Sequence, residues 1–159
     1  MRVVIMKIRD MVLEDFKEVS KLMYQVHNLH LENRNDIYKE SNPMSKNEFI
    51  NILEDNHCIS ILSEENNEVL GLCMASIKEV SNHSVLKDRK VGYLDVLCVE
   101  ASCRKRGIGK KLCDEIMFRL REKGAVSLEL MVWSFNKEAI NFYESIGMVE
   151  RNKVMEYKL

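Results

Sequence analysis

The chain has 159 residues, a length typical of one domain with its own hydrophobic core. Apolar residues make up 46% and charged residues 31%, with six glycines and one proline, which excludes collagen, low-complexity linkers and intrinsically disordered chains. Lysine plus arginine number 24 and aspartate plus glutamate 25, so the net charge of −1 gives no general attraction to nucleic acid or to an anionic membrane. We therefore expect a single domain over residues 1–159 that binds neither.

The cysteines and the start of the chain indicate a cytoplasmic protein. The five cysteines are Cys58, Cys73, Cys98, Cys103 and Cys113. They have neither C-x-x-C spacing nor a histidine at zinc-finger distance, so we interpret them as reduced and mostly buried. No apolar run reaches the roughly 18 residues of a membrane span, and the first six residues are too short for a signal peptide. Met1 and Met6 are alternative starts, since MKIRDM reads as a natural beginning.

In chain order, the first part predicts a strand and two helices. Residues 3–9 mix β-branched and charged side chains and predict a first strand. From Leu13 the apolar side chains recur every three or four residues, which predicts an amphipathic helix. Residues 31–44 are polar and contain the single proline, so we expect a loop or a broken helix. Ser45 and Glu48 have the spacing of a capping box and predict the start of a second helix.

The middle of the chain predicts consecutive strands. Residues 57–63 and 69–80 are strand-like and are joined by a short polar turn, a pattern typical of a β-hairpin. A loop is expected at 81–90. Residues 91–99, VGYLDVLCV, are strongly β-prone and are expected to be buried on both faces for much of their length.

The last part predicts two helices that alternate with two strands. A helix is expected over Gly107–Lys123, with Gly124 as its C-cap glycine, then a strand at 127–132, a helix at 137–145 and a closing strand at 149–158. The resulting order, β-α-α-β-β-β-α-β-α-β, predicts a mixed α/β domain.

A basic turn separates the strand at 91–99 from the helix that follows it. Its residues are Arg104, Lys105, Arg106, Gly107, Ile108, Gly109, Lys110 and Lys111, of which five are cationic. Glycine lets a ligand approach the backbone closely, and the free N–H groups of a helix start bind anions, so the turn predicts a pyrophosphate site. It lacks the third glycine of a dinucleotide fingerprint and the pattern of a P-loop. A solvated helix start and a nucleic-acid contact are the alternatives.

Two motifs carry a resemblance to a known family. Arg104-x-x-Gly107-x-Gly109 matches a Gln/Arg-x-x-Gly-x-Gly/Ala signature, and residues 136–148, NKEAINFYESIGM, are similar to Asn-x-x-Ala-x-x-Phe-Tyr-x-x-x-Gly-Phe. Together they resemble the GNAT superfamily of acyl-CoA-dependent N-acetyltransferases. The resemblance implies an α/β (α+β) fold, in which helices flank a mixed, mostly antiparallel sheet that splays between its fourth and fifth strands.

The resemblance also implies a site for acetyl-CoA, used as a co-substrate without a metal. The pyrophosphate would lie against the basic turn, and the pantetheine arm would add to the sheet like a strand. The residues implied in cofactor binding are Leu97, Cys98, Val99, Arg104, Lys105, Arg106, Gly107, Ile108, Gly109, Lys110, Asn136 and Tyr143. A backbone N–H near Cys98 would polarise the thioester carbonyl. Asn136 would lie beside the cofactor, cap the following helix, or do both.

Tyr143 and Asp95 are the candidate catalytic residues. Tyr143 is the expected general acid for the departing thiolate, because a phenol of pKa about 10 can donate that proton, and a core position is the alternative. Asp95 lies two residues before Leu97, so strand alternation predicts that they share a face. Asp95 is a candidate base, a contact for a cationic substrate, or a paired structural acid. Cys98 should face the other way, which favours direct transfer over an acyl-cysteine intermediate.

The acceptor is expected to be a small-molecule primary amine. The resemblance implies that residues 24–40 and 81–90 line its side of the site, and these residues carry no dominant charge. The alternatives are a protein N-terminus or lysine as acceptor, or a non-catalytic module that binds acetyl-CoA. His27 and His30 are spaced like metal ligands, but with no third ligand nearby we interpret them as surface or packing residues. A homodimer is left open.

Overall fold

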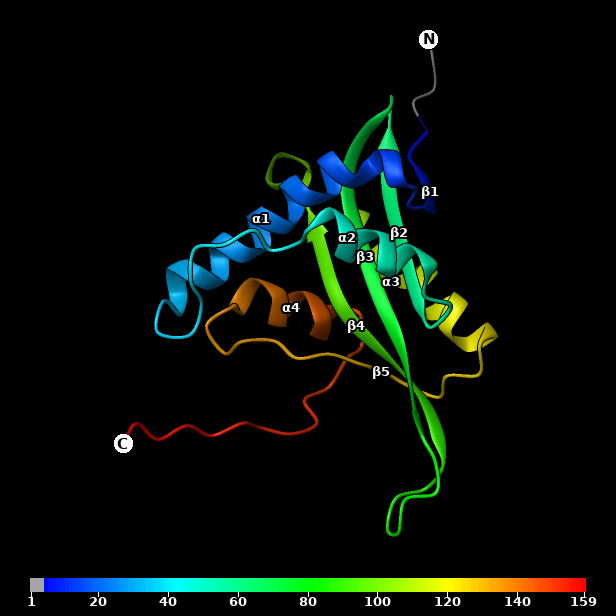
Figure 1. Ribbon diagram of the computed structural model, residues 1–159, viewed down its shortest axis with the longest axis vertical. Coiled ribbons are helices and arrows are strands. Elements are labelled where there is room, and N and C mark those ends of the chain that lie inside the picture. Colours follow the sequence, from blue (N-terminus) through cyan, green and yellow to red (C-terminus); the bar gives the residue numbers. More distant parts are fainter. Residues whose placement is uncertain (1–4) are drawn as a thin grey trace.

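A long antiparallel hairpin forms the centre of the sheet. The five strands are β1 (Lys7–Asp10), β2 (Cys58–Glu65), β3 (Glu68–Val80), β4 (Arg89–Val99) and β5 (Leu128–Glu129). They lie in the order β1-β2-β3-β4-β5, and every pair is antiparallel except β4 with β5, which is parallel (Figure 1). This computed structural model thus confirms the predicted mixed, mostly antiparallel sheet. It describes residues 5–159, so residues 3–4 of the expected first strand lie outside the described part.

Helices cover both faces of this sheet. They are α1 (Phe16–Asn33), α2 (Lys46–Glu54), α3 (Ile108–Glu122) and α4 (Lys137–Ser145), with the short 3-10 turns η1 (Leu13–Asp15) and η2 (Ala101–Cys103). The first two helices pack on one face, and the last two on the other (Figure 1). The helix predicted over 137–145 is confirmed to the residue.

Strand alternation divides the core between the two faces. On β2, Ile61 points to the α3 side, where it packs in the same cluster as Leu112, while its neighbour Leu62 points to the α1 and α2 side with Val19 and Phe49. All five side chains are fully buried. The same alternation along β4 decides which of its residues face α1 and which face α3.

Local signals fix the predicted turns and helix starts. Glu48 Oε2 accepts from Ser45 N at 2.7 Å while Ser45 Oγ accepts from Glu48 N at 3.2 Å, so the capping box of α2 is confirmed. Asn66 and Asn67 have φ values of 53° and 65°, the left-handed pair that a two-residue hairpin turn needs. The predicted β2–β3 hairpin is therefore confirmed.

Two predicted strands differ from the structure. The strand expected at 127–132 pairs with β4 through two residues, since the chain beyond Glu129 diverges from β4. The closing strand expected at 149–158 is wrong for this chain: these residues form no strand and are exposed. An alternating sequence makes a strand only where a neighbouring edge accepts its hydrogen bonds, and the fold of one chain does not bring the two together.

Truncation of a side chain between α3 and the sheet should destabilise the fold. Leu112 is fully buried, so Leu112→Ala is expected to lower the free energy of unfolding by about 3 kcal/mol through lost contacts and a cavity. Leu86→Ala, at a half-exposed leucine of the β3–β4 loop, is the matched control and should change it by less than about 0.5 kcal/mol. Urea denaturation measures both, and equal effects would contradict the assigned core.

Candidate active site

The sheet opens between β4 and β5. These strands pair at Gly92–Leu128 and Tyr93–Glu129, and no described residue pairs with that side of β4 farther on. Glu100 N donates to Leu70 O of β3 at 2.8 Å, so alternation turns the backbone N–H and C=O groups of Leu97 and Val99 toward the opening. An extended ligand that carries amides can pair with such an edge. The expected splay between the fourth and fifth strands is confirmed.

A β-bulge interrupts β4 at Asp95. The residues on either side of it pair with β3, while Asp95 has no partner in the ladder. Leu97 packs against the α3-side core, whereas the carboxyl group of Asp95 lies near Ser76, which alternates with Met74 on the α1 and α2 side. The prediction that Asp95 shares a face with Leu97 is therefore wrong, because the bulge inserts one residue and reverses the alternation.

Opposing effects act on the pKa of the Asp95 carboxyl group. Partial desolvation raises its pKa above the ordinary value, while the interaction with Ser76 and the charge of Lys78 oppose that rise. Lys78 Nζ lies 3.6 Å from the ring centroid of Tyr93, so the cation is held beside the same stretch of β4. Asp95 is thus a carboxylate with increased basicity, on the side of the sheet that faces α1.

Cys98 points away from Leu97, as predicted. Its thiol donates to Leu22 O of α1 at 3.5 Å and accepts from Gln25 Nε2 at 3.2 Å. Burial raises the pKa of Cys98 to about 11, so the thiol stays protonated at neutral pH. A buried, protonated thiol on this face is a packing residue and not a nucleophile.

Gln25 was not identified from the sequence, yet it fastens the end of β4 to α1. Its Nε2 also donates to Val99 O at 3.0 Å, and its Oε1 accepts from Ala101 N at 3.3 Å. These bonds fix the backbone at the open edge just before the basic turn. One polar residue in an amphipathic helix resembles any surface residue, so the sequence carried no signal for this role.

The basic turn leads into an uncapped helix start. Gly107, with φ of 76°, is the N-cap of α3, and no side chain caps the helix. Lys111 N makes the first intrahelical bond, to Gly107 O at 3.1 Å, which leaves the N–H groups of Ile108, Gly109 and Lys110 directed out of the helix. This geometry supports the predicted anion site.

The second glycine of the turn serves packing. A Cβ on Gly109 would lie 3.3 Å from the ring of Phe142, so its absence lets α4 approach the start of α3 closely. Phe142 belongs to the second sequence motif, and Gly109 to the first. The two motifs are therefore joined by a direct contact between their helices.

Exposed ion pairs surround the turn. Arg104 pairs with Glu138 of α4 at 3.3 Å, Arg106 with Glu65 of β2 at 2.8 Å, and Lys110 with Asp114 at 2.6 Å. Exposed pairs of this kind contribute little stability, so a polyanion can replace these carboxylates at small cost.

The α4 helix carries Asn136 and Tyr143. Asn136 Oδ1 accepts from Ala139 N at 3.1 Å, which confirms that this residue caps the helix. Tyr143 is mostly buried, and burial followed by the nearby Cys113 and Cys73 thiols raises its pKa above the ordinary value. Its hydroxyl therefore stays protonated over the neutral range and can act as a donor.

Aromatic side chains join the α1–α2 loop to the segment before α4. Trp133 Nε1 donates to the Tyr38 hydroxyl at 3.0 Å, and the Tyr38 ring stacks on His30 with centroids 5.1 Å apart. Phe135 stacks on Trp133, and His27 contacts the edge of Tyr38. The interpretation of the two histidines as packing residues is confirmed, while the contribution of Trp133 and Phe135 to this cluster was not predicted from the sequence.

The loop at 81–90 does not join this aromatic cluster. It lies at the far tip of the β3–β4 hairpin, well away from the α1–α2 loop (Figure 1). Its predicted place beside residues 24–40 is therefore wrong, because the long β3 and β4 strands carry it beyond the body of the fold. The 130–136 segment lies beside residues 24–40 instead, through the Trp133–Tyr38 hydrogen bond.

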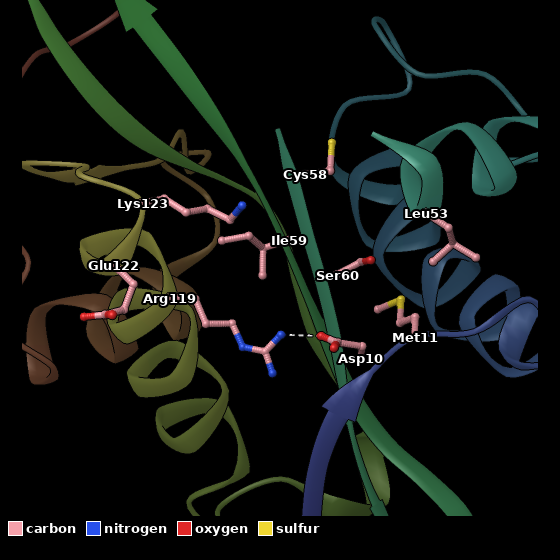
Figure 2. A pocket seen from close by; sticks show the side chains of 9 residues that line it. All are labelled: Asp10, Met11, Leu53, Cys58, Ile59, Ser60, Arg119, Glu122 and Lys123. Atoms are coloured by element: carbon pink, nitrogen blue, oxygen red, sulfur yellow. Dashed lines mark hydrogen bonds and ion pairs between the residues drawn. The ribbon is translucent and has the colours of Figure 1, made fainter. Parts of the chain in front are cut away.

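A separate cavity of about 450 Å³ lies at another edge of the sheet. Figure 2 shows it between the end of β1, the start of β2 and the C-terminal end of α3, with the Arg119–Asp10 ion pair across it. None of the predicted site residues lines it. Over residues 5–159, no cluster of three or more potential metal ligands occurs, and no helix is both long and apolar enough to cross a membrane.

Comparisons with known proteins identify the family. The model of the Acetyltransferase (GNAT) family matches residues 23–148, so the chain belongs to the GNAT acetyltransferase family. A mutant of the BH1408 protein from Bacillus halodurans is 26% identical with a TM-score of 0.93, covering 96% of this chain and 99% of that one. The aminoglycoside N-acetyltransferase AAC(6')-Iy in complex with CoA has 20% identity and a TM-score of 0.77, covering 99% and 97%.

A shorter match relates the chain to a curated enzyme. N-alpha-acetyltransferase 30 of Saccharomyces cerevisiae is 29% identical over 68 residues, which are 43% of this chain and 39% of that protein. The chain thus spans less than half the length of the curated relatives it matches.

The family implies acetyl-CoA, and the residues present fit it. The open edge at Leu97 and Val99 offers amide partners to pantetheine, and the uncapped start of α3 offers N–H groups and cations to pyrophosphate. These features are continuous along the chain, with Gln25 holding the backbone between them.

Removal of two cations from the turn should weaken CoA binding. Lys105→Gln combined with Arg106→Gln is expected to raise the Kd for CoA about tenfold, since charge-assisted phosphate contacts are lost. Calorimetry with CoA and with pantetheine separates the effects, because pantetheine lacks the pyrophosphate and should bind both proteins equally. Lys87→Gln with Lys46→Gln, at exposed lysines of the β3–β4 loop and of α2, is the matched control. Equal weakening for both ligands would contradict the assigned pyrophosphate site.

Proposed function

We propose that this protein is an acetyl-CoA-dependent N-acetyltransferase that transfers acetyl directly to a small-molecule primary amine. The observation that carries the proposal is the open edge of β4, which runs straight into the uncapped, cationic start of α3. A ligand with two amides and a pyrophosphate matches both parts at once. Five free cysteines, three of them buried, also support a reducing, cytoplasmic location.

The chain's residues would bind and orient the two substrates. The backbone of Val99 pairs with a pantetheine amide, while the N–H groups of Ile108 to Lys110 hold the pyrophosphate. When bound, acetyl-CoA supplies an activated acetyl thioester. A backbone N–H near Cys98 polarises its carbonyl, which makes the carbon more electrophilic toward the amine.

Two side chains would move the protons. An alkylammonium of pKa about 10 must lose a proton before it attacks, and Asp95, whose pKa is raised by desolvation, accepts it directly or through water. The new C–N bond forms as the C–S bond breaks, and Tyr143 gives its proton to the departing thiolate. Because burial raises the pKa of Tyr143, this proton is present throughout the neutral range.

The aromatic cluster supports a small acceptor. The Trp133–Tyr38 hydrogen bond ties the α1–α2 loop to the 130–136 segment, so this side is closed by a fixed wall rather than left as a long groove. A fold neighbour acts on aminoglycosides, which are small polyamines, according to its name. The name of the yeast relative favours a second candidate, acetylation of protein N-termini.

An acceptor panel tests the proposal. Thiol release from acetyl-CoA is measured with small alkylamines, aminoglycosides, free amino acids, peptides with free N-termini and N-blocked lysine peptides. Turnover of the small amines alone supports the proposal, and turnover of the peptides alone supports the second candidate. Acetyl-CoA binding by calorimetry without any turnover would instead indicate a non-catalytic module.

Removal of the Tyr143 hydroxyl should slow turnover without disturbing binding. Tyr143→Phe keeps the ring against Phe142, so the Kd for acetyl-CoA should stay within about twofold while kcat falls about 10²-fold, the usual contribution of a general acid. Steady-state kinetics and calorimetry measure the two effects. A near-normal kcat of Tyr143→Phe at every pH would show that Tyr143 is not the general acid.

Replacement of Asp95 should give a loss that depends on pH. Asp95→Asn is expected to lower the rate about 10²-fold at pH 7, and the deficit should shrink as the pH approaches the pKa of the amine, where free amine needs no base. A constant deficit at all pH values would instead indicate that Asp95 only binds the substrate. Ser76→Ala is the control. It removes an interaction that lowers the pKa of Asp95, so the acidic limb of the pH–rate profile should shift to higher pH.

A further inference from the structure

The cavity between the end of β1 and the C-terminal end of α3 takes no part in the proposed reaction. β1 stops at Asp10, which pairs with Ile61, while β2 begins three residues earlier, at Cys58. Residues 58–60 therefore have no described strand beside them on this side, and only Met11 N donates to Ser60 O, at 3.0 Å. The difference in strand length leaves the space of about 450 Å³ that Figure 2 shows.

Apolar side chains from three parts of the chain form one wall of this cavity. Met11 follows β1, Ile59 belongs to β2 and Leu53 to α2. Met11 and Ile59 are each 5% exposed, and Leu53 is partly buried. Sites for small molecules combine such an apolar wall with a few polar groups that fix the orientation of the ligand.

Charges of both signs face the same space. Arg119 and Lys123, one turn apart on α3, extend toward Asp10 and β2, whereas Glu122 points the other way (Figure 2). Arg119 forms an ion pair with Asp10 across the cavity. Lys123 Nζ donates to Asn56 O at 3.4 Å and forms no ion pair with any described residue. Two cations and one carboxylate are therefore available to a ligand.

The end of a helix alone does not explain this arrangement. Cations stabilise the last turn of a helix wherever they point, and Arg121 of the same turn lines no part of the cavity. Arg119 instead reaches across the cavity to Asp10, whose side chain is 71% exposed. An ion pair with so hydrated a partner contributes little stability, so a ligand can replace it at small cost.

We propose that this cavity binds an α-amino acid with an apolar side chain. At neutral pH such a ligand carries both a carboxylate and an ammonium group. Its carboxylate takes the place of Asp10 beside Arg119 and Lys123, and its ammonium binds the released Asp10. Its side chain covers the apolar wall. The proposal goes beyond the proposed function and does not depend on it, because this binding needs no acetyl-CoA.

Ligands that each lack one chemical feature give the first test. L-leucine has all three features, while 4-methylpentanoate lacks the ammonium, 3-methylbutylamine lacks the carboxylate and glycine lacks the apolar side chain. NMR titration of the methyl-labelled protein without acetyl-CoA should give leucine a Kd on the order of 1 mM. Each of the other ligands should bind about tenfold more weakly or worse, because it loses one set of contacts. Equal binding of any of them would contradict the proposal.

The same spectra locate the ligand. The methyl signals of Met11, Leu53 and Ile59 should shift and saturate with leucine, while the indole N–H signal of Trp133 should stay in place. Shifts at Trp133 without shifts in the cavity would mean that leucine binds as an acceptor amine. That outcome would overturn the cavity site and leave the proposed function intact.

Charge variants give the second test. Arg119→Gln should weaken leucine binding about tenfold through the loss of a charge-assisted contact. Arg121→Gln, in the same helical turn but outside the cavity, is the matched control and should change the Kd by less than about twofold. Thermal unfolding verifies that both variants remain folded. Equal losses in the two variants would mean a general effect of charge and would overturn the site.

Asp10→Asn should affect two ligands in opposite directions. Leucine should bind about tenfold more weakly, because its ammonium loses the carboxylate. In contrast, 4-methylpentanoate should bind more tightly, because Asp10 no longer competes with it for Arg119. Weaker binding of both ligands would mean that Asp10 only maintains the shape of the cavity, and the assignment of the ammonium to Asp10 would be wrong.

Discussion

The separation of β5 from β4 beyond Tyr93 is the constraint on which the rest of the site depends. A parallel strand that followed β4 to its end would use the N–H and C=O groups of Leu97 and Val99 and leave nothing for a ligand. Because β5 leaves after two residues, the sheet keeps a usable edge inside the fold. The strand then passes directly into the basic turn, so amide pairing and anion binding are contiguous.

Two contacts hold this opening in place from opposite sides of the sheet. On the α1 side, Gln25 bonds to Val99 O and Ala101 N, which fixes the backbone where β4 ends. On the α3 side, the missing side chain of Gly109 lets Phe142 pack against the helix start. The first motif is thereby tied to α4, the helix that carries Tyr143.

Burial and the β-bulge assign different proton chemistry to the two candidate catalytic residues. Desolvation favours the neutral form of each, so Tyr143 remains a donor, while the partly desolvated carboxyl group of Asp95 becomes a better acceptor than a fully hydrated carboxylate. The bulge turns Asp95 toward the α1 side of the sheet, which also carries the aromatic cluster of Tyr38 and Trp133. The proposed base therefore faces the proposed acceptor.

The sequence by itself determined the elements and the cofactor motifs, because the capping box at Ser45, the helix at 137–145 and the glycine turn depend on neighbouring residues. It could not determine the face of Asp95, since a bulge is defined by the partner strand, or the role of Gln25, whose partners lie more than seventy residues away. The alternation at 149–158 encoded a strand, but only the tertiary structure decided that its own sheet does not receive it. Hydrogen bonds between strands need a second edge, and the position of that edge is a property of the whole fold.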